Sequence, residues 1–191
     1  MANILFCVTG PSGSGKTSIM REIFDNELLS FTTRKKRDGE KEGVDYNFIS
    51  YQDYIIMVGR QELIEKTEYD GNYYGLSSKE LYSKLNKGNA FFICDNSGFN
   101  QVKDKYDKVV SIFLYASFED CFQNMQDRGD DIKKISNRLS TYHDEVSNKG
   151  QYDYVVKNIR GNRRHTIETV AWIVSSEIKK GEVLNEPTKL L

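Results

Sequence analysis

The sequence predicts an α/β domain in which helices cover both faces of a largely parallel sheet. Apolar runs of strand length alternate with segments of helical periodicity along the chain. The first apolar run leads directly into a glycine-rich loop and then into a helix. The only two prolines among the 191 residues are Pro11 and Pro187, so no proline-rich linker divides the chain. This length suits one domain with a sizeable core.

The expected elements follow in chain order. Ile4–Val8 is a continuous apolar run, typical of a strand buried on both faces. Apolar residues at helical spacing predict a helix from Thr17 to about Asn26. Later strands are expected at Ala90–Cys94, Val109–Tyr115 and Tyr154–Val156. Later helices are expected at Lys79–Lys87 (capped by Ser78), Phe118–Asp127, Ile132–Ser147 and Thr166–Lys179.

Residues 31–78 differ from this pattern, because they are polar and rich in Arg, Lys, Gly and Tyr. Strand-like pieces occur at Asp45–Ile49 and Glu62–Tyr69, and Gly71-Asn72 is a turn signal. The segment therefore predicts a small mixed α/β subdomain inserted into the larger frame.

Composition limits the class of function. The net charge of −1 argues against a strongly basic nucleic-acid binder. No segment reaches the roughly 18 apolar residues of a membrane span. The three cysteines show neither metal-ligand spacing nor a disulfide framework, which favours a reducing compartment. We therefore expect a cytoplasmic protein without nucleic-acid or membrane partners.

The glycine-rich loop matches the complete phosphate-binding pattern G-x-x-x-x-G-K-[ST]. Such a loop points backbone N–H groups at an anion, with the positive end of a helix behind it. Lys16 is expected to reach the β- and γ-phosphates of ATP, and the Thr17 hydroxyl to ligate Mg²⁺. A chance Gly/Ser loop is the alternative, but the flanking strand and helix favour a P-loop NTPase core. The predicted ATP contacts are Gly10, Pro11, Ser12, Gly13, Ser14, Gly15, Lys16, Thr17 and Ser18.

A second basic segment follows at Ser30–Glu40. Arg34 and Arg37 can clamp one phosphate, since each presents a planar fork of donors. A solvated basic turn is the alternative reading. A downstream cluster of Glu65 with Tyr73-Tyr74-Gly75 favours a second ligand site instead.

At these residues the sequence resembles the guanylate kinase family. The family pattern S-x-T-T-R-x-x-R-x-G-E-x-x-G-x-D-Y-x-F fits Ser30–Phe48 without a gap. A glutamate nine residues before the second tyrosine of G-N-Y-Y-G also matches, at Glu65 and Tyr74. The resemblance extends from about Ile4 to Ile159, and the combined motifs are much more specific than the loop alone.

The resemblance implies transfer of the ATP γ-phosphate to GMP, and also to dGMP. Glu65 would accept hydrogen bonds from N1–H and N2–H₂ of guanine, and Ser30 would address O6. Arginine and tyrosine side chains would hold the phosphate of the acceptor. The implied acceptor site comprises Ser30, Arg34, Arg37, Glu40, Tyr46, Glu65, Tyr74 and Asp95.

The resemblance also implies a helical lid at residues 121–148, which carries Arg128-Gly129, Arg138 and then the acid Glu145. Arg128 and Arg138 would act with Lys16 in catalysis; a surface ion pair is the alternative role for a helical arginine. Asn158 would contact adenine, or otherwise cap a turn. Asp95 is a second candidate for Mg²⁺, through a water.

The implied organisation is one domain over residues 1–191. Its core comprises 1–30, 79–120 and 149–185, with the acceptor subdomain at 31–78 and a tail at 186–191. The chain departs from the family pattern at Leu76, Ile93 and Asn124. These departures leave two alternatives open, a related P-loop kinase with a different phosphate-bearing acceptor and a catalytically silent interaction module. Monomer and homodimer are both compatible with the sequence.

Overall fold

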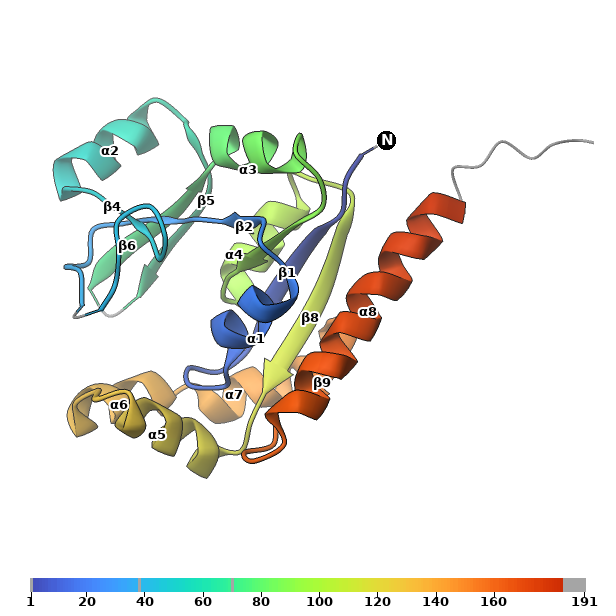
Figure 1. Cartoon of the computed structure of the whole chain (residues 1–191). Coiled ribbons are helices and arrows are strands. Elements are labelled where there is room, and N and C mark those ends of the chain that lie inside the picture. The colour runs from blue at the N-terminus through green and yellow to red at the C-terminus, as the bar shows by residue number, and fades with distance from the viewer. Residues whose placement is uncertain (1, 38, 70, 184–191) are drawn as a thin grey trace, which may run out of the picture.

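The computed structural model describes residues 2–37, 39–69 and 71–183. Its main layer is a five-stranded sheet (Figure 1). The strand order is β2-β7-β1-β8-β9, and every neighbouring pair is parallel. The expected α/β class with a parallel sheet is confirmed. The strands are β1 (Leu5–Thr9), β2 (Glu27–Leu28), β7 (Ala90–Ile93), β8 (Val109–Tyr115) and β9 (Tyr154–Lys157).

Helices cover both faces of this sheet because the side chains of β1 alternate between two apolar clusters. Phe6 and Val8 pack with residues of α1 (Lys16–Ile23) and α8 (Arg163–Val183). Leu5 and Cys7 pack with residues of α3 (Ser78–Leu85) and α4 (Asn96–Lys103). All four of these strand side chains have 1% or less of their surface exposed, which explains the continuous apolar run in the sequence.

A second sheet forms the inserted subdomain, with strand order β4-β3-β6-β5. Its β5 and β6 form an antiparallel hairpin, with a register shift between Leu63 and Glu65. The helix α2 (Tyr51–Gly59) was not expected, because its tyrosines and isoleucines equally suit a strand. Ser50 decides the outcome, since its hydroxyl caps the Asp53 N–H. The strands are β3 (Phe31–Thr32), β4 (Asn47–Phe48), β5 (Leu63–Tyr69) and β6 (Asn72–Ser77).

Two helix predictions need correction. The cap of α3 is Ser77, whose hydroxyl accepts from the Glu80 N–H, and not Ser78. The single helix expected at Ile132–Ser147 is two helices, α6 (Ile132–Leu139) and α7 (Tyr142–Ser147). The chain turns between them at residues 140–141, and the buried Tyr142 that follows donates its hydroxyl to the Ala116 carbonyl, directly after β8, at 2.7 Å.

The helices α5 (Phe118–Asp127), α6 and α7 follow β8 and gather at the carboxyl end of the sheet (Figure 1). A short 3₁₀ turn at Lys149–Gln151 leads from α7 into β9. No helix within the described ranges is long and apolar enough to cross a membrane. The tail expected at 186–191 lies outside the described residues.

Candidate active site

The phosphate loop joins β1 to α1 at the carboxyl edge of the sheet, where parallel α/β sheets bind ligands. Two of its glycines are required by both conformation and space. Gly10 and Gly13 have φ of 130° and 80°, in the range that favours glycine. A Cβ on Gly10 would lie 2.1 Å from the Leu114 carbonyl oxygen, and one on Gly13 would lie 2.4 Å from that of Cys121. The loop therefore lies directly against the backbone of β8 and α5.

Lys16 begins α1, and its amine bends back over the loop. Its Nζ donates to the carbonyl oxygens of Gly10 at 2.5 Å and Pro11 at 2.8 Å. Burial lowers the pKa of Lys16 to about 8, and the positive charge of Arg138 acts in the same direction. The negative charge of Glu145 opposes both effects. The amine therefore lies near both the phosphate loop and the helices that follow β8.

Asn158 and Asn124 hold the loop from outside. The Asn158 amide donates to the Ser14 carbonyl at 2.9 Å and accepts from Thr166 at 3.0 Å. The Asn124 amide donates to the Gly13 carbonyl at 2.9 Å. These contacts give both side chains a structural role in the loop, and the adenine contact of Asn158 stays a prediction. Asn124 stands at a position where the sequence departs from the family pattern.

The remaining polar residues of the loop differ in their surroundings. The Ser18 hydroxyl donates to the Gly15 carbonyl at 3.0 Å. Ser12 and Thr17 are half-buried. The Ser14 side chain is fully buried at the base of the loop.

The basic segment of the subdomain is organised by one carboxylate. The two oxygens of Glu40 accept from Arg34 Nη2 at 2.7 Å and from the Arg37 backbone N–H at 2.8 Å. The Arg34 guanidinium also lies over the Tyr46 ring, 5.4 Å from its centre, and the Tyr46 ring packs edge-on against that of Tyr74. The structure thus brings five predicted acceptor residues together.

Arg37 lies in a strongly positive region. Burial lowers its pKa, and the charges of Arg34 and Arg138 lower it further. The carboxylates of Asp130 and Glu40 only partly offset these effects. An excess of convergent cations is the arrangement that a phosphate group stabilises.

The predicted base reader, Glu65, lies on β5 with only 3% of its surface exposed. Its Oε1 accepts from the Thr67 hydroxyl at 2.8 Å. Burial raises the pKa of Glu65 to about 7, and the nearby charge of Asp95 raises it too. Asp95 caps α4, since its Oδ1 accepts from the Gly98 N–H at 2.7 Å. Ser30 immediately precedes β3 and is half-buried.

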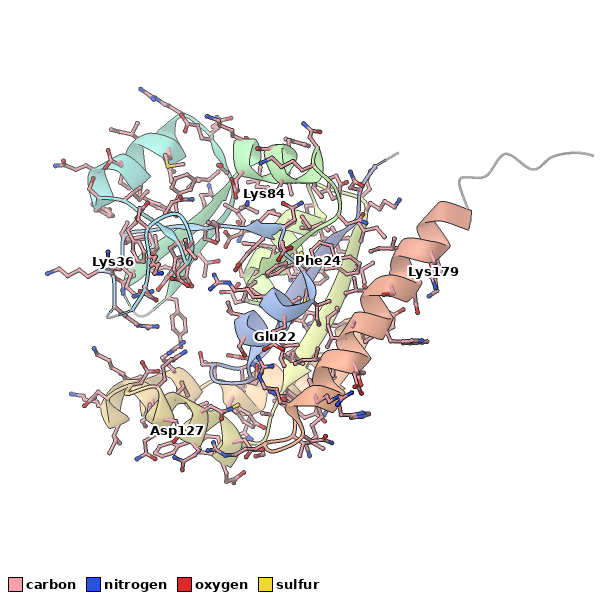
Figure 2. All side chains as sticks on the ribbon, viewed as in Figure 1. Glu22, Phe24, Lys36, Lys84, Asp127 and Lys179 are labelled. Carbon is pink, nitrogen blue, oxygen red and sulfur yellow. The ribbon has the colours of Figure 1, made fainter. Side chains whose placement is uncertain are left out.

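Both predicted lid arginines pair with Asp130, which the sequence reading did not single out. Arg128 forms a close ion pair with Asp130 and is half exposed. Arg138 is 3.4 Å from the same carboxylate and only 18% exposed. Because the charge of Arg138 acts on both Lys16 and Arg37, its guanidinium lies near both the phosphate loop and the basic cluster. Figure 2 shows the side chains of the subdomain around Lys36 and those of the helices after β8 around Asp127.

Tyr69, at the end of β5, is a site residue that the sequence did not reveal. It lies near Ser12 of the loop and Arg138 of the lid, both of which act on its hydroxyl. Burial raises the pKa of the Tyr69 hydroxyl, while the charge of Arg138 and the polar side chains of Ser12 and Arg138 oppose that rise. Its only sequence signal is its place beside the predicted turn at Gly71, which puts it at the tip of a hairpin.

Unsatisfied polar atoms mark all three parts of the site. Among the described residues, Ser14 Oγ, Glu65 Oε2 and Arg138 Nε are buried without a hydrogen-bond partner. Such atoms are costly unless a ligand satisfies them. One belongs to the loop, one to the acceptor subdomain and one to the lid. Each of the three parts therefore keeps a polar atom that a bound nucleotide can satisfy.

The acidic side chains near the loop suit a cation that is bound partly by substrate phosphates and water, and not one enclosed by protein ligands alone. Within the described ranges, no three His, Cys, Asp or Glu side chains are grouped as metal ligands. Mg²⁺ commonly takes one or two protein oxygens and completes its shell with water and substrate phosphates. The Thr17 hydroxyl at the start of α1 fits that pattern, and Asp95 keeps one oxygen beyond its capping bond.

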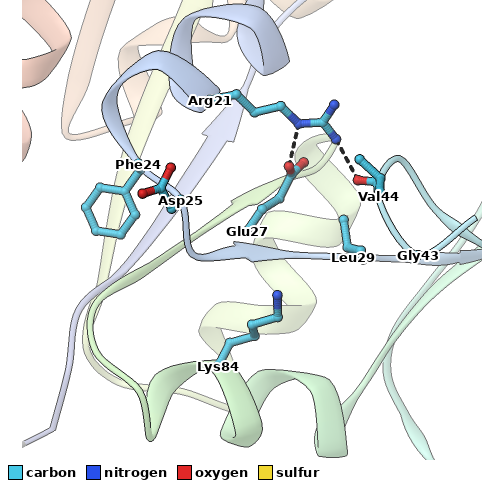
Figure 3. Close-up of a pocket in the computed structure, with 8 residues that line it drawn as sticks. All are labelled: Arg21, Phe24, Asp25, Glu27, Leu29, Gly43, Val44 and Lys84. Carbon is cyan, nitrogen blue, oxygen red and sulfur yellow. Dashed lines mark hydrogen bonds and ion pairs between the residues drawn. The ribbon is translucent and has the colours of Figure 1, made fainter. Parts of the chain in front are cut away.

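A separate pocket of about 340 Å³ lies at the junction of the core with the subdomain (Figure 3). Arg21 of α1 spans it and pairs with Glu27 at 2.6 Å and Asp45 at 2.8 Å. It also donates to the Val44 carbonyl. None of the predicted site residues lines this pocket, so it is distinct from the candidate active site.

A phosphate loop and a facing basic cluster, with an arginine-bearing lid between them, define a P-loop phosphotransferase with separate donor and acceptor sites. The sequence model of guanylate kinase matches residues 3–177. Guanylate kinase of Enterococcus faecalis is 36% identical over 164 residues, which cover 81% of this chain and 80% of that protein. That of Dechloromonas aromatica is 34% identical over 166 residues, covering 83% and 82%. The chain belongs to the guanylate kinase family.

A solved structure agrees with this assignment. The crystal structure of guanylate kinase from Anaplasma phagocytophilum superposes with a TM-score of 0.72 at 27% identity. The match covers 92% of this chain and 86% of that one. The similarity therefore extends over the sheet, the inserted subdomain and the helices after β8.

Proposed function

We propose that this chain is a guanylate kinase, which transfers the γ-phosphate of ATP to GMP or dGMP and releases ADP and the guanosine diphosphate. The observation that carries the proposal is a complete phosphate loop beneath Lys16 together with a second basic cluster, in which Glu40 accepts from Arg34 at 2.7 Å. Arg138, whose charge acts on Lys16 and on Arg37, lies near both sites, where charge moves during phosphoryl transfer.

On the donor side, backbone N–H groups of the loop and Lys16 bind the β- and γ-phosphates. The Lys16 amine exchanges its two carbonyl partners for phosphate oxygens, which are stronger acceptors because they are charged. Thr17 would hold Mg²⁺, with Asp95 acting through water. The cation would neutralise charge that develops on the phosphates.

On the acceptor side, Arg34, Arg37, Tyr46 and Tyr74 hold the phosphate of GMP. The acceptor phosphate is already ionised, so an oxygen of that group attacks the γ-phosphorus without a general base. The bond from the γ-phosphorus to the bridging oxygen breaks, and ADP leaves with the electron pair. Arg128 and Arg138 stabilise the charge on the transferred group, and closure of the lid excludes water.

Guanine is selected by Glu65, whose Oε2 has no partner among the described residues. Guanine offers N1–H and N2–H₂ to this carboxylate. Adenine offers no donor at N1 and would leave the buried carboxylate unsatisfied, a difference that can discriminate by about 10⁴. We assign Ser30 to O6 of the base.

The test is a coupled assay of ADP formation with Mg-ATP and, separately, GMP, dGMP, AMP, UMP, CMP and ribose phosphates. We expect turnover with GMP and dGMP, and at least a thousandfold lower kcat/KM with the other acceptors. Equal use of the four ribonucleotides would refute the assignment of guanine. Preference for a ribose phosphate would establish a related kinase with a different acceptor. The absence of turnover, together with no thermal stabilisation by Mg-ATP, would establish a silent module.

A further inference from the structure

The face of the β5–β6 hairpin that carries Glu65 also carries a hydroxyl that the sequence reading did not single out. Glu65 pairs with Leu76 across the two strands, and Thr67 pairs with Tyr74. Paired residues, and residues two apart on one strand, share a face of a sheet. Glu65, Thr67, Tyr74 and Leu76 therefore lie on one face of the hairpin.

Only two donors on this hairpin reach the Glu65 carboxylate within the described residues. Thr67 Oγ1 donates to Oε1 at 2.8 Å, and the Leu76 backbone N–H lies close enough to the carboxylate to lower the pKa of Glu65. The Leu76 side chain is apolar and fully buried, so it adds no donor. Oε2 is buried without a hydrogen-bond partner in the described part of the chain. Among the described side chains of this face, Thr67 is thus the one that donates to Oε1.

A buried glutamate needs such a partner. Ordering a long carboxylate side chain costs conformational entropy, and burial disfavours its charge. The neighbouring groups do not help, since Asp95 on α4 raises the pKa of Glu65 further. Cys94, directly after β7, and Tyr54 on α2 also lie near this carboxylate, and their own pKa values are raised. The Thr67 hydroxyl and the Leu76 N–H are the groups that lower the pKa of Glu65.

The backbone beneath the pair is independently anchored. The Gln101 amide of α4 makes two hydrogen bonds with Lys66, one to its N–H and one to its carbonyl, both at 2.9 Å. Lys66 stands between Glu65 and Thr67, so β5 is tied to the core at this point. A small change in the Thr67 side chain should therefore leave the strand in place.

We propose that Thr67 is a positioning residue for acceptor recognition, whose hydroxyl holds the Glu65 carboxylate so that Oε2 faces the edge of the guanine base. This inference rests on the proposed function, in which Glu65 reads guanine. Thr67 does not touch the reacting phosphate, so its effect falls on acceptor binding and not on the chemical step. Because its hydroxyl favours the charged carboxylate, it also sets the pH at which the base is recognised.

The test compares Thr67→Val, which keeps the branched shape and removes the hydroxyl, with Thr67→Ser, which keeps the hydroxyl. Thr169→Val is the matched control, because Thr169 lies on α8, away from the candidate site, and its hydroxyl donates to the His165 carbonyl of the same helix. For each variant, kcat, KM for GMP and KM for ATP are measured between pH 6 and pH 9. Thermal unfolding establishes that each variant is folded.

We expect Thr67→Val to raise KM for GMP at least about tenfold at pH 7.5, the effect of losing one hydrogen bond to a charged group. Its kcat and its KM for ATP should stay within about twofold of wild type. The pH at which GMP binding is half-maximal should rise, because the charged carboxylate has lost a donor. Thr67→Ser and Thr169→Val should behave like wild type.

Two results overturn the inference while the proposed function stands. In one, Thr67→Val matches wild type in KM for GMP and in the pH profile. In the other, Thr67→Ser is impaired as much as Thr67→Val, which would assign the effect to packing. If wild type shows no preference for guanine, the proposed function fails and takes the role of Thr67 with it.

Discussion

The phosphate loop permits a quantitative test at Gly13. This residue has a left-handed backbone conformation, and there is no space beside it for a side chain. Its φ is 80°, and an added Cβ would lie 2.4 Å from the Cys121 carbonyl oxygen. Neither the loop backbone at Gly13 nor the α5 backbone at Cys121 is free to move away from the other. The Gly13 carbonyl is held by the Asn124 amide, and Cys121 is in α5, where its N–H donates to the Ser117 carbonyl at 2.9 Å.

Gly161 provides a matched control for the substitution Gly13→Ala. Its φ is 83°, and an added Cβ would meet nothing within 4 Å. Both alanine variants incur about 1–2 kcal/mol for the left-handed conformation. Only Gly13→Ala adds an overpacking cost of about 1–3 kcal/mol. For a domain of this size, its Tm should lie about 2–12 °C below that of Gly161→Ala.

The assay is thermal and urea unfolding of both variants, with and without Mg-ATP. We expect Gly161→Ala to keep the stabilisation that wild type gains from Mg-ATP. Gly13→Ala should lose most of it, because the loop must move away from α5. Equal Tm values for the two variants would refute the packing argument, and unchanged Mg-ATP stabilisation of Gly13→Ala would show that this contact does not shape the site.

Three further predictions concern charged groups. The folded chain holds a proton on Glu65 up to about pH 7, whereas the ordinary pKa is 4.5. The Tm of Glu65→Gln should therefore rise relative to that of wild type as pH rises from 5 to 8. The same variant should lose guanine selectivity while still binding ATP. Burial lowers the pKa of Lys16 from 10.5 to about 8, so Lys16→Met should abolish turnover yet raise Tm at pH 7. That Tm advantage should shrink between pH 8 and pH 10, and a constant advantage would contradict the assigned cause. Arg21→Met removes the ion-pair partner of Glu27 and Asp45. It should lower the free energy of urea unfolding by about 1–2 kcal/mol and leave ATP binding unchanged. A change within about 0.5 kcal/mol would show that the two ion pairs are too solvated to add stability.

The elements that the sequence predicted well are those whose local pattern and tertiary role agree. β8 spans Val109–Tyr115 as expected, because a strand buried on both faces must be continuously apolar. The helix Phe118–Asp127 also has the expected bounds, and Ser117 caps it. Where local signals were ambiguous, as in α2, a single capping residue decided the structure.

Sequence spacing also supplied most of the candidate site residues, because the phosphate loop and the acceptor segment are contiguous motifs, and the roles of these residues stay predictions. It could not identify Asp130, Tyr69 or Thr67, since each matters through contact with a residue from another motif. Thr67 offered one signal, its place two residues from Glu65 on a predicted strand. That signal had no meaning until the hairpin register placed both side chains on one buried face.

The sequence by itself determined the class of chemistry. A complete phosphate-loop pattern between a strand and a helix predicts anion binding, and the order of strands and helices predicts a parallel sheet with that loop at its carboxyl edge. Only the tertiary structure decided how the charges meet. Arg138 lies near both Lys16 and Arg37, and within the described residues Glu65 is buried with one oxygen fixed by Thr67 and the other unpaired. Burial and proximity set those properties, and both depend on chain segments that are distant in sequence.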